Sequence, residues 1–134
     1  MNNKIYEIVD LKLYEIYYGS FGCSCLIVFS NEEYEFDTIE EDIEAFLYLF
    51  KRLVDEGLIL VHAPINGEPE KEIQGDKFWD VSSDRMIEYI RSVLPSDPKF
   101  LWGGLDDKDD EWSKFWYYDC PTIRWVDKET GQIY

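Results

Sequence analysis

The sequence has few positive charges for its length. Thirteen Lys and Arg residues stand against 29 Asp and Glu residues in 134, which gives a formal net charge of −16. Binding to nucleic acid needs cationic side chains that replace the counterions of the phosphates, and anionic membrane surfaces also attract basic proteins. The charge balance therefore disfavours direct contact with nucleic acid or membrane. It favours a basic protein partner, a cation or simple solubility.

Cysteines and long apolar runs are also scarce. The three cysteines, Cys23, Cys25 and Cys120, are odd in number and form no CxxC pair. The first residues do not resemble a signal peptide, and no apolar run approaches the roughly 20 residues of a membrane span. These features predict a cytoplasmic protein with reduced thiols.

Motifs with catalytic or cofactor chemistry are missing as well. The sequence has no GxSxG, GxxxxGK[ST] or HExxH motif. His62 is the single histidine and follows an apolar segment, where a structural or solvated histidine is the common case. No spacing in the sequence pairs His62 with a cysteine. We expect no enzyme activity and no cofactor, and an enzyme built on His62 or a cysteine ranks last.

A metal site is not expected either. The acidic run from Asp106 to Glu111 invites comparison with the EF-hand calcium loop, which needs Gly at its sixth position and Glu at its twelfth. Counted from Asp107, these positions are Trp112 and Tyr118. The calcium-binding template therefore fails.

The clearest positive signal is a helix from Thr38 to Gly57. Thr38 and Glu41 form a capping box, and Gly57 suits the position just after a helix. An apolar stripe recurs at helical spacing, formed by Ile39, Ile43, Phe46, Leu47, Phe50, Leu53 and Val54. The rest of the chain must cover this surface.

Two further segments favour helices. Ser82 or Ser83 caps one of them, Pro95 ends it, and its apolar side is formed by Met86, Ile87, Ile90, Val93 and Leu94. Residues 4–18 also favour a helix, stopped at Gly19-Ser20, although parts of the segment alternate like a strand. Residues 21–29 fit a buried strand or a short packed helix, and periodicity does not decide between them.

Short strands complete the pattern. They are predicted at 58–62, 77–81 and 122–127, the last pairing through a turn at 128–131 with residues 132–134. Residues 63–75 are predicted to form a surface loop, or the tip of an irregular hairpin, with a turn at Asn66-Gly67. We expect one α+β domain over residues 1–134, with two or three helices packed on a small antiparallel sheet.

Two acidic segments beside aromatic residues are the candidate binding sites. The first consists of Asp106, Asp107, Asp109, Asp110, Glu111 and Trp112. The second and weaker candidate consists of Glu32, Glu33 and Glu35, beside Tyr34 and Phe36. Carboxylates there can steer a basic protein toward the surface, and the aromatic side chains can anchor it.

The second half of the chain also has a particular order of features. LFKRLVDEGLILV is followed by SSDRMIEYIRSVLPSD and by the closing segment FWYYDCPTIRWVDKETGQIY. In the closing segment an aromatic–acidic–Cys-Pro stretch precedes a strand with tryptophan, through Phe115, Trp116, Asp119, Cys120, Pro121, Trp125 and Val126. From Thr38 to Tyr134 this order resembles a family of small acidic bacterial proteins of unknown function. Similar proteins occur among the immunity proteins of polymorphic toxin and contact-dependent growth-inhibition systems.

The resemblance implies a cytosolic, antitoxin-like binding protein, and it supplies no catalytic residues. Together with the charge, it predicts an immunity protein that neutralises a cognate basic toxin, such as a nuclease, by occluding its cationic surface. The alternative is a non-catalytic homodimer with a structural or regulatory role, in which the acidic residues serve solubility.

Overall fold

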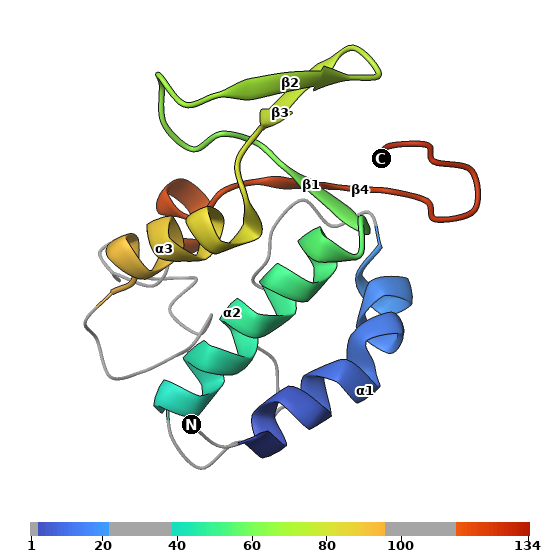
Figure 1. The fold of residues 1–134 in the computed structure, drawn as a ribbon. Helices are drawn as coiled ribbons and strands as arrows, with labels where there is room; N and C mark the ends of the chain where they lie inside the picture. The colour runs from blue at the N-terminus through green and yellow to red at the C-terminus, as the bar shows by residue number, and fades with distance from the viewer. Residues whose placement is uncertain (1–2, 22–38, 96–114) are drawn as a thin grey trace.

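The computed structural model describes residues 3–21, 39–95 and 115–134 (Figure 1). The fold is α+β, as predicted. The elements in chain order are α1 (Asn3–Ser20), α2 (Ile39–Asp55), β1 (Ile59–Val61), β2 (Glu70–Ile73), β3 (Asp76–Trp79), α3 (Ser83–Val93), the π-helical turn η3 (Phe115–Asp119) and β4 (Ile123–Trp125).

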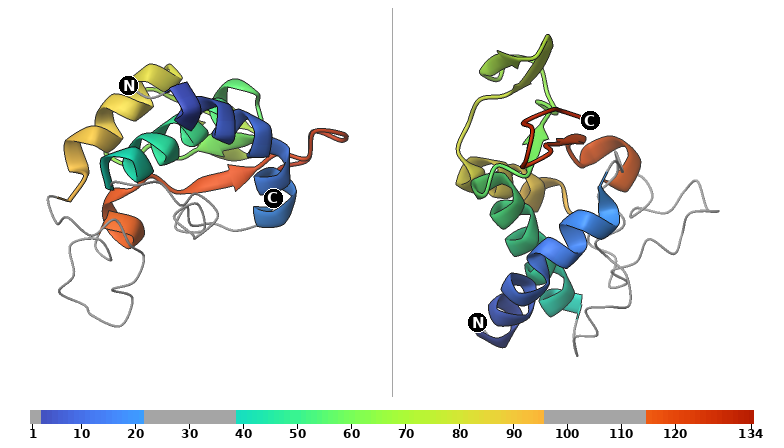
Figure 2. Two further views of the ribbon diagram at one scale, coloured as in Figure 1. Left: turned by 90° about the horizontal axis from the view of Figure 1, so that it is seen from below. Right: turned by 90° about the vertical axis from the view of Figure 1, so that its right-hand side faces the viewer.

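Helix α2 lies in the middle of the molecule, with α1 on one side and α3 on the other (Figures 1 and 2). The ring of Tyr6 lies 4.5 Å from that of Tyr48, and one turn further along both helices Asp10 pairs with Arg52. Helices α1 and α2 therefore run side by side in the same direction. Strand β1 follows directly from the end of α2.

The predicted apolar stripe of α2 forms the centre of the core. Phe46, Leu47, Phe50 and Leu53 are all buried, as the periodicity requires. Ala45 and Leu49 are buried as well, because α2 is covered from two sides and its buried surface is wider than one stripe. Thr38, the predicted cap, lies outside the described residues.

Gly57 terminates helix α2. Its φ of 71° is in the left-handed region, which glycine adopts without steric cost. The Gly57 N–H donates to the Val54 carbonyl at 3.0 Å, and the Leu58 N–H donates to the Leu53 carbonyl at 2.9 Å. This pair of bonds is the Schellman motif, and it turns the chain into β1 as the sequence predicted.

The segment that was ambiguous between helix and strand forms helix α1. Its buried side faces the core through Ile5, Val9, Leu13, Ile16 and Tyr17. The Tyr17 hydroxyl donates to the Val126 carbonyl at 2.6 Å and accepts the Lys128 N–H at 3.2 Å, so the end of α1 is bonded to the C-terminal segment. The choice between strand and helix at 21–29 concerns residues that, after Phe21, lie outside the described ones.

The strands form two separate pairs rather than one sheet. Strand β1 pairs with β4 in antiparallel register, with Ile59 opposite Trp125 and Val61 opposite Ile123. These four side chains point into the core. An antiparallel bridge between Val126 and Ile133 confirms the predicted turn back at the C-terminus.

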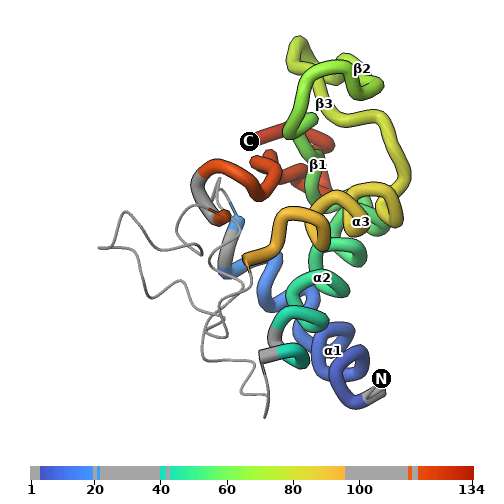
Figure 3. Tube along the Cα trace, turned by 90° about the vertical axis from the view of Figure 1, so that its left-hand side faces the viewer, coloured from blue at the N-terminus to red at the C-terminus, as the bar shows by residue number. Residues whose placement is uncertain are grey.

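Strands β2 and β3 correct the prediction for residues 63–75. That segment was expected to be a loop or the tip of an irregular hairpin. A hairpin is present, but β2 lies within the segment and pairs with β3 in antiparallel register through a turn at Gln74-Gly75. The turn at Asn66-Gly67 is present, but it is not the hairpin tip. The sequence of β2, EKEI, has almost no buried side chain, so it lacks the apolar alternation by which strands are detected. Figure 3 shows this hairpin at the opposite end of the molecule from the N-terminus.

Helix α3 begins as predicted, and the structure selects Ser82 as its cap. The Ser82 hydroxyl accepts the Arg85 N–H at 3.2 Å, and Met86 and Ile90 are buried against α2. The aromatic segment before β4 forms η3. Its Phe115 is fully buried, and the Cys120 N–H donates to the Phe115 carbonyl at 2.7 Å.

A pair of identical substitutions tests the central position of α2. Leu53→Ala removes a side chain with 0% exposure and should lower the free energy of unfolding by about 2–5 kcal/mol, because it leaves a cavity in the core. Leu11→Ala on α1 removes a side chain with 84% exposure and should change that free energy by less than about 0.5 kcal/mol. Urea denaturation followed by tryptophan fluorescence measures both. Equal losses in the two variants would contradict the packing described above.

Candidate functional site

The two acidic segments predicted as binding sites lie outside the described residues. This concerns Asp106, Asp107, Asp109, Asp110, Glu111 and Trp112, and also Glu32, Glu33 and Glu35. Cys23 and Cys25 lie outside them too. The described surface is the one that α1, α2, α3 and the strands present.

His62 has structural partners. Its ring lies 5.0 Å from the ring of Phe78, and its Nε2 is 3.5 Å from a carboxylate oxygen of Asp76. The same oxygen of Asp76 is 3.5 Å from the guanidinium of Arg124. These contacts join β1, β3 and β4. Cys120 is a buried member of the core.

Two features that the described residues lack bear on the class of site. No group of three or more His, Cys, Asp and Glu residues there is arranged to hold a metal ion. Within the same ranges, no helix combines the length and the apolar character that crossing a membrane requires.

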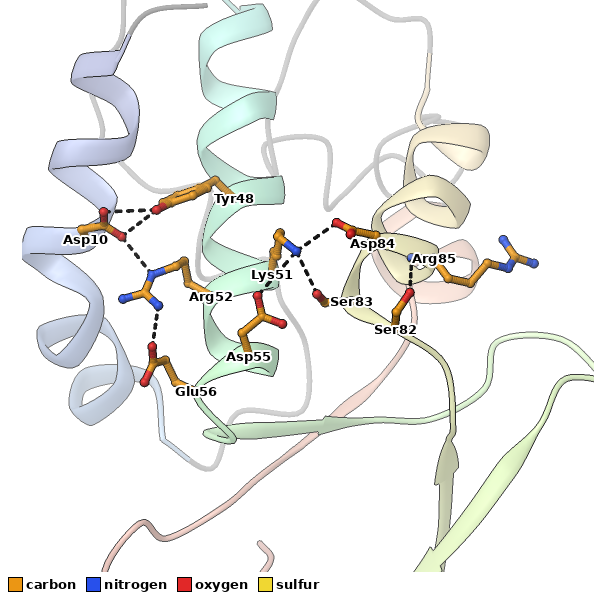
Figure 4. A network of polar contacts seen from close by, with 10 residues as sticks. All are labelled: Asp10, Tyr48, Lys51, Arg52, Asp55, Glu56, Ser82, Ser83, Asp84 and Arg85. Carbon is orange, nitrogen blue, oxygen red and sulfur yellow. Dashed lines mark hydrogen bonds and ion pairs between the residues drawn. The ribbon is translucent and has the colours of Figure 1, made fainter.

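A polar network crosses the outer side of α1 and α2 (Figure 4). The Tyr48 hydroxyl donates to the Asp10 carboxylate at 2.9 Å, and Arg52 Nε donates to the same carboxylate at 2.9 Å. Arg52 also pairs with Glu56 one turn along α2. Burial, followed by the bond to Asp10, raises the pKa of Tyr48.

Lys51 makes the corresponding connection from α2 to α3 (Figure 4). Its ammonium group donates to the Asp84 carboxylate at 2.9 Å and to the Ser83 hydroxyl at 3.0 Å, and it lies 3.5 Å from Asp55. Hydrogen bonding to Asp84 raises the pKa of Lys51. The positive charge of Lys51 is therefore used to hold two helices together.

Other cations on this surface are also paired within the molecule. Arg91 forms a bidentate pair with Glu44, with distances of 2.6 and 2.7 Å, which joins α3 to α2. Arg85 lies 2.9 Å from Glu68, and Lys71 lies 4.0 Å from Asp80. The carboxylates outnumber these cations, and several lie exposed without taking part in the ion pairs above, namely Glu7, Glu15, Glu40, Glu70, Glu72 and Glu129. The cations are neutralised in place, and the surplus of negative charge faces solvent.

A cluster of aromatic side chains at the end of α1 holds one more cation. The Lys128 ammonium lies 4.9 Å from the ring centroid of Tyr14 and 5.4 Å from that of Tyr18. Hydrogen bonding to Tyr18 raises the pKa of Lys128. A surface cavity of about 210 Å³ adjoins the cluster, and it is lined by Tyr17, Tyr18, Phe21, Asp127, Lys128 and Glu129. Tyrosine faces attract cations through the ring quadrupole, so this end of α1 is suited to positively charged groups.

Neither this cluster nor the polar network was predicted from the sequence. The signal available for the cluster was the occurrence of Leu11, Tyr14 and Tyr18 at helical spacing in a segment that already had an apolar side. The Lys128 partner lies more than 100 residues away in the chain, so no local pattern connects it with α1.

No protein-family model matches the chain, and no curated protein matches it. Among solved structures, the chain is similar to one described as an uncharacterised protein conserved in bacteria, from Neisseria meningitidis, with a TM-score of 0.67 and 18% sequence identity. The match covers 99% of this chain and 93% of that one. At this identity the match shows that the two proteins share a fold.

The pairing of Lys51 predicts how stability depends on alkaline pH. Because the pKa of Lys51 is raised above its ordinary 10.5 in the folded state, its stabilisation is complete below pH 10.5 and is lost as the pH rises through the folded value. Asp84 is largely exposed, so screening by solvent limits the pair to about 0.5 kcal/mol.

Lys51→Met should therefore be slightly less stable than wild type at neutral pH and should lose less stability on going to strongly alkaline pH. Urea denaturation across this range measures the difference. Lys77→Met, which changes an exposed lysine on β3, is the matched control and should follow the wild-type pH dependence. A Lys51 variant with the wild-type slope would refute the assignment.

Proposed function

We propose that this protein is a cytoplasmic immunity protein that binds a cognate basic toxin and blocks its cationic surface. The observation that carries the proposal is the distribution of charge. The chain has a net charge of −16, and many of its cations are held in internal pairs between helices and strands. The surface offered to a partner is therefore acidic.

This charge distribution suits competition with nucleic acid. A toxin that acts on nucleic acid needs a cationic surface that holds phosphate groups. An acidic protein docked on that surface removes the positive potential and covers the entrance, and complementary potentials accelerate the encounter. Many of the Lys and Arg side chains of this protein are paired with its own carboxylates, so their repulsion of the toxin's cations at the interface is reduced.

The acidic run from Asp106 to Glu111, with Trp112, remains the proposed steering segment, and Glu32, Glu33 and Glu35 remain second. Reversing the charges of the run should slow association with the toxin and leave the fold intact, because all six of its residues are charged, and charged residues are rarely core residues. Stopped-flow association measured at low and high salt tests this. Unchanged association rates in the reversed variant would remove the run from the interface.

The alternative function is a non-catalytic homodimer with a structural or regulatory role. The exposed Leu11, Tyr14 and Tyr18 on α1 favour an interface of some kind, since apolar side chains gathered on one surface commonly mark a contact region. Two copies of a chain with a charge of −16 repel each other, however, whereas a basic partner is attracted.

Affinity capture from the source cell tests the proposed function. The tagged protein is immobilised at low salt, and bound proteins are eluted at increasing salt concentration and identified by mass spectrometry. We expect a single basic polypeptide, released by salt, whose expression alone arrests growth and whose effect is reversed by co-expression of this protein. Recovery of the bait alone, with the mass of a dimer by light scattering, would instead support the homodimer.

A further inference from the structure

Strand β2 has one free edge. It pairs with β3 along its other edge, and in the part of the chain that the structure describes no further strand pairs with it. The hairpin of β2 and β3 stands at the end of the molecule away from the N-terminus (Figures 1 and 3). Glu70, Lys71 and Glu72 are exposed, so the edge is open to solvent. An open edge presents backbone N–H and C=O groups to which another strand can bond.

The register of the hairpin decides which residues offer these groups. The Asp80 N–H donates to the Pro69 carbonyl at 2.8 Å, so these two residues form a hydrogen-bonded pair. Hydrogen-bonded and non-hydrogen-bonded pairs alternate along an antiparallel ladder, which places Glu70 and Glu72 in pairs of the second kind. Residues of such a pair turn their N–H and C=O away from each other. The backbone groups of Glu70 and Glu72 therefore point to the free edge.

The hairpin is fixed to the rest of the molecule, so its free edge is preformed. Phe78 and Trp79 of β3 are buried. At the turn, the Gln74 side chain donates to the Gly131 carbonyl at 2.7 Å and accepts the Ile133 N–H at 3.3 Å. A preformed surface loses less conformational freedom when a partner binds.

The charges of the edge indicate its occupant. Among the described residues, Glu70 and Glu72 take part in no ion pair, whereas Lys71 lies 4.0 Å from Asp80. Lys77 stands opposite Glu72 on β3, on the side away from the free edge. Residues directly opposite each other on neighbouring strands lie about 4.5–5.5 Å apart at Cβ, so a strand added at the edge places its own side chains beside both glutamates. Lys or Arg at those positions complements the two carboxylates.

A second copy of this chain does not fit the edge. In an antiparallel pair of two β2 strands, the free backbone groups match only where Glu70 or Glu72 of one copy faces Glu70 or Glu72 of the other. Like charges directly opposite each other destabilise a sheet. The edge therefore opposes self-pairing and admits a basic strand.

We propose that the free edge of β2 pairs with an extended segment of the toxin that carries Lys or Arg at alternate positions. The segment adds a third, antiparallel strand to the hairpin. Its backbone bonds to the N–H and C=O groups of Glu70 and Glu72, and its basic side chains lie beside the two carboxylates, which determine the specificity. This inference rests on the proposed function and specifies the docking surface and the form of the partner segment.

A synthetic peptide tests the edge without the natural toxin. The probe is a peptide in which Lys and Thr alternate, added to the isotope-labelled full chain and followed by nuclear magnetic resonance at about 0.15 M salt, where charges beyond about 8 Å are largely screened. We expect the amide groups of Glu70 and Glu72 to shift and to become protected from hydrogen exchange. The amide groups of Lys71 and Ile73 face β3 and should change little.

Two methylated peptides separate backbone pairing from attraction by charge. In an antiparallel ladder, the lysines opposite Glu70 and Glu72 exchange backbone bonds with them, and the threonines turn their N–H groups to solvent. N-methylation of the lysine amides should therefore weaken binding by about tenfold or more. N-methylation of the threonine amides leaves the charge and the paired groups unchanged, and this peptide should bind as the unmodified one does.

Variants of β2 test the same edge from the side of the protein. Glu72→Pro removes an N–H that β3 does not use, and an edge strand tolerates proline at such a position. Glu70→Lys with Glu72→Lys reverses the charges. Each should weaken binding of the unmodified peptide by about tenfold or more. Glu7→Lys with Glu15→Lys changes two exposed acids of α1 by the same charge and is the matched control, which should bind as wild type does. Far-UV circular dichroism verifies that each variant is folded.

The outcomes separate this inference from the proposed function. If the peptide leaves the amide groups of Glu70 and Glu72 unchanged, or if the two methylated peptides bind equally well, only this inference is overturned. Equal losses in the α1 control and in the β2 charge variant overturn it in the same way. If wild type is a dimer by light scattering and Glu72→Pro is a monomer, a second copy occupies the edge and the inference is overturned. A failure of the proposed function shows separately, because affinity capture then yields no basic polypeptide although the peptide protects the edge.

Discussion

The burial of α2 on two sides is the constraint on which the rest of the structure depends. The apolar side chains of α2 span a wider arc of its surface than one neighbouring element can cover. Helices α1 and α3 and the β1–β4 pair are therefore all required to exclude water from α2. These elements are placed by this requirement, whereas the β2–β3 hairpin packs against β1. The Schellman end at Gly57 and the cap at Ser82 set where the helices stop and start, and the strands follow from there.

The shortage of cations has two consequences that reinforce each other. Each Lys or Arg used between elements, as Lys51 is between α2 and α3, anchors a carboxylate that would otherwise repel its neighbours. The same use neutralises that cation, although its side chain stays partly exposed. The chain can thus hold its helices together with ion pairs and still present an acidic face, because it contains more than twice as many acids as cations.

Tyrosine has different roles on the two sides of α1. Tyr17 is buried and bonds to the backbone of the C-terminal segment, whereas Tyr14 and Tyr18 are exposed and hold a lysine from that segment on their faces. Apolar residues on both sides of one helix also explain why residues 4–18 were ambiguous in sequence. Leu11 and Leu13 cannot belong to the same buried stripe, and their alternation imitates a strand.

The sequence by itself determined the elements whose signals are local. The periodicity of α2, the glycine after it, the serine cap of α3 and the alternation of β4 all depend on neighbouring residues, and the structure contains each of them. It also determined the excess of acids. Only the tertiary structure decided which side of α1 is buried, so that Leu11 is exposed. It also placed Lys128 against Tyr14 of α1, and it formed β2 from a polar segment through pairing with β3. The physical reason is that burial, cation–aromatic contacts and strand pairing depend on residues far apart in the chain, which no local pattern connects.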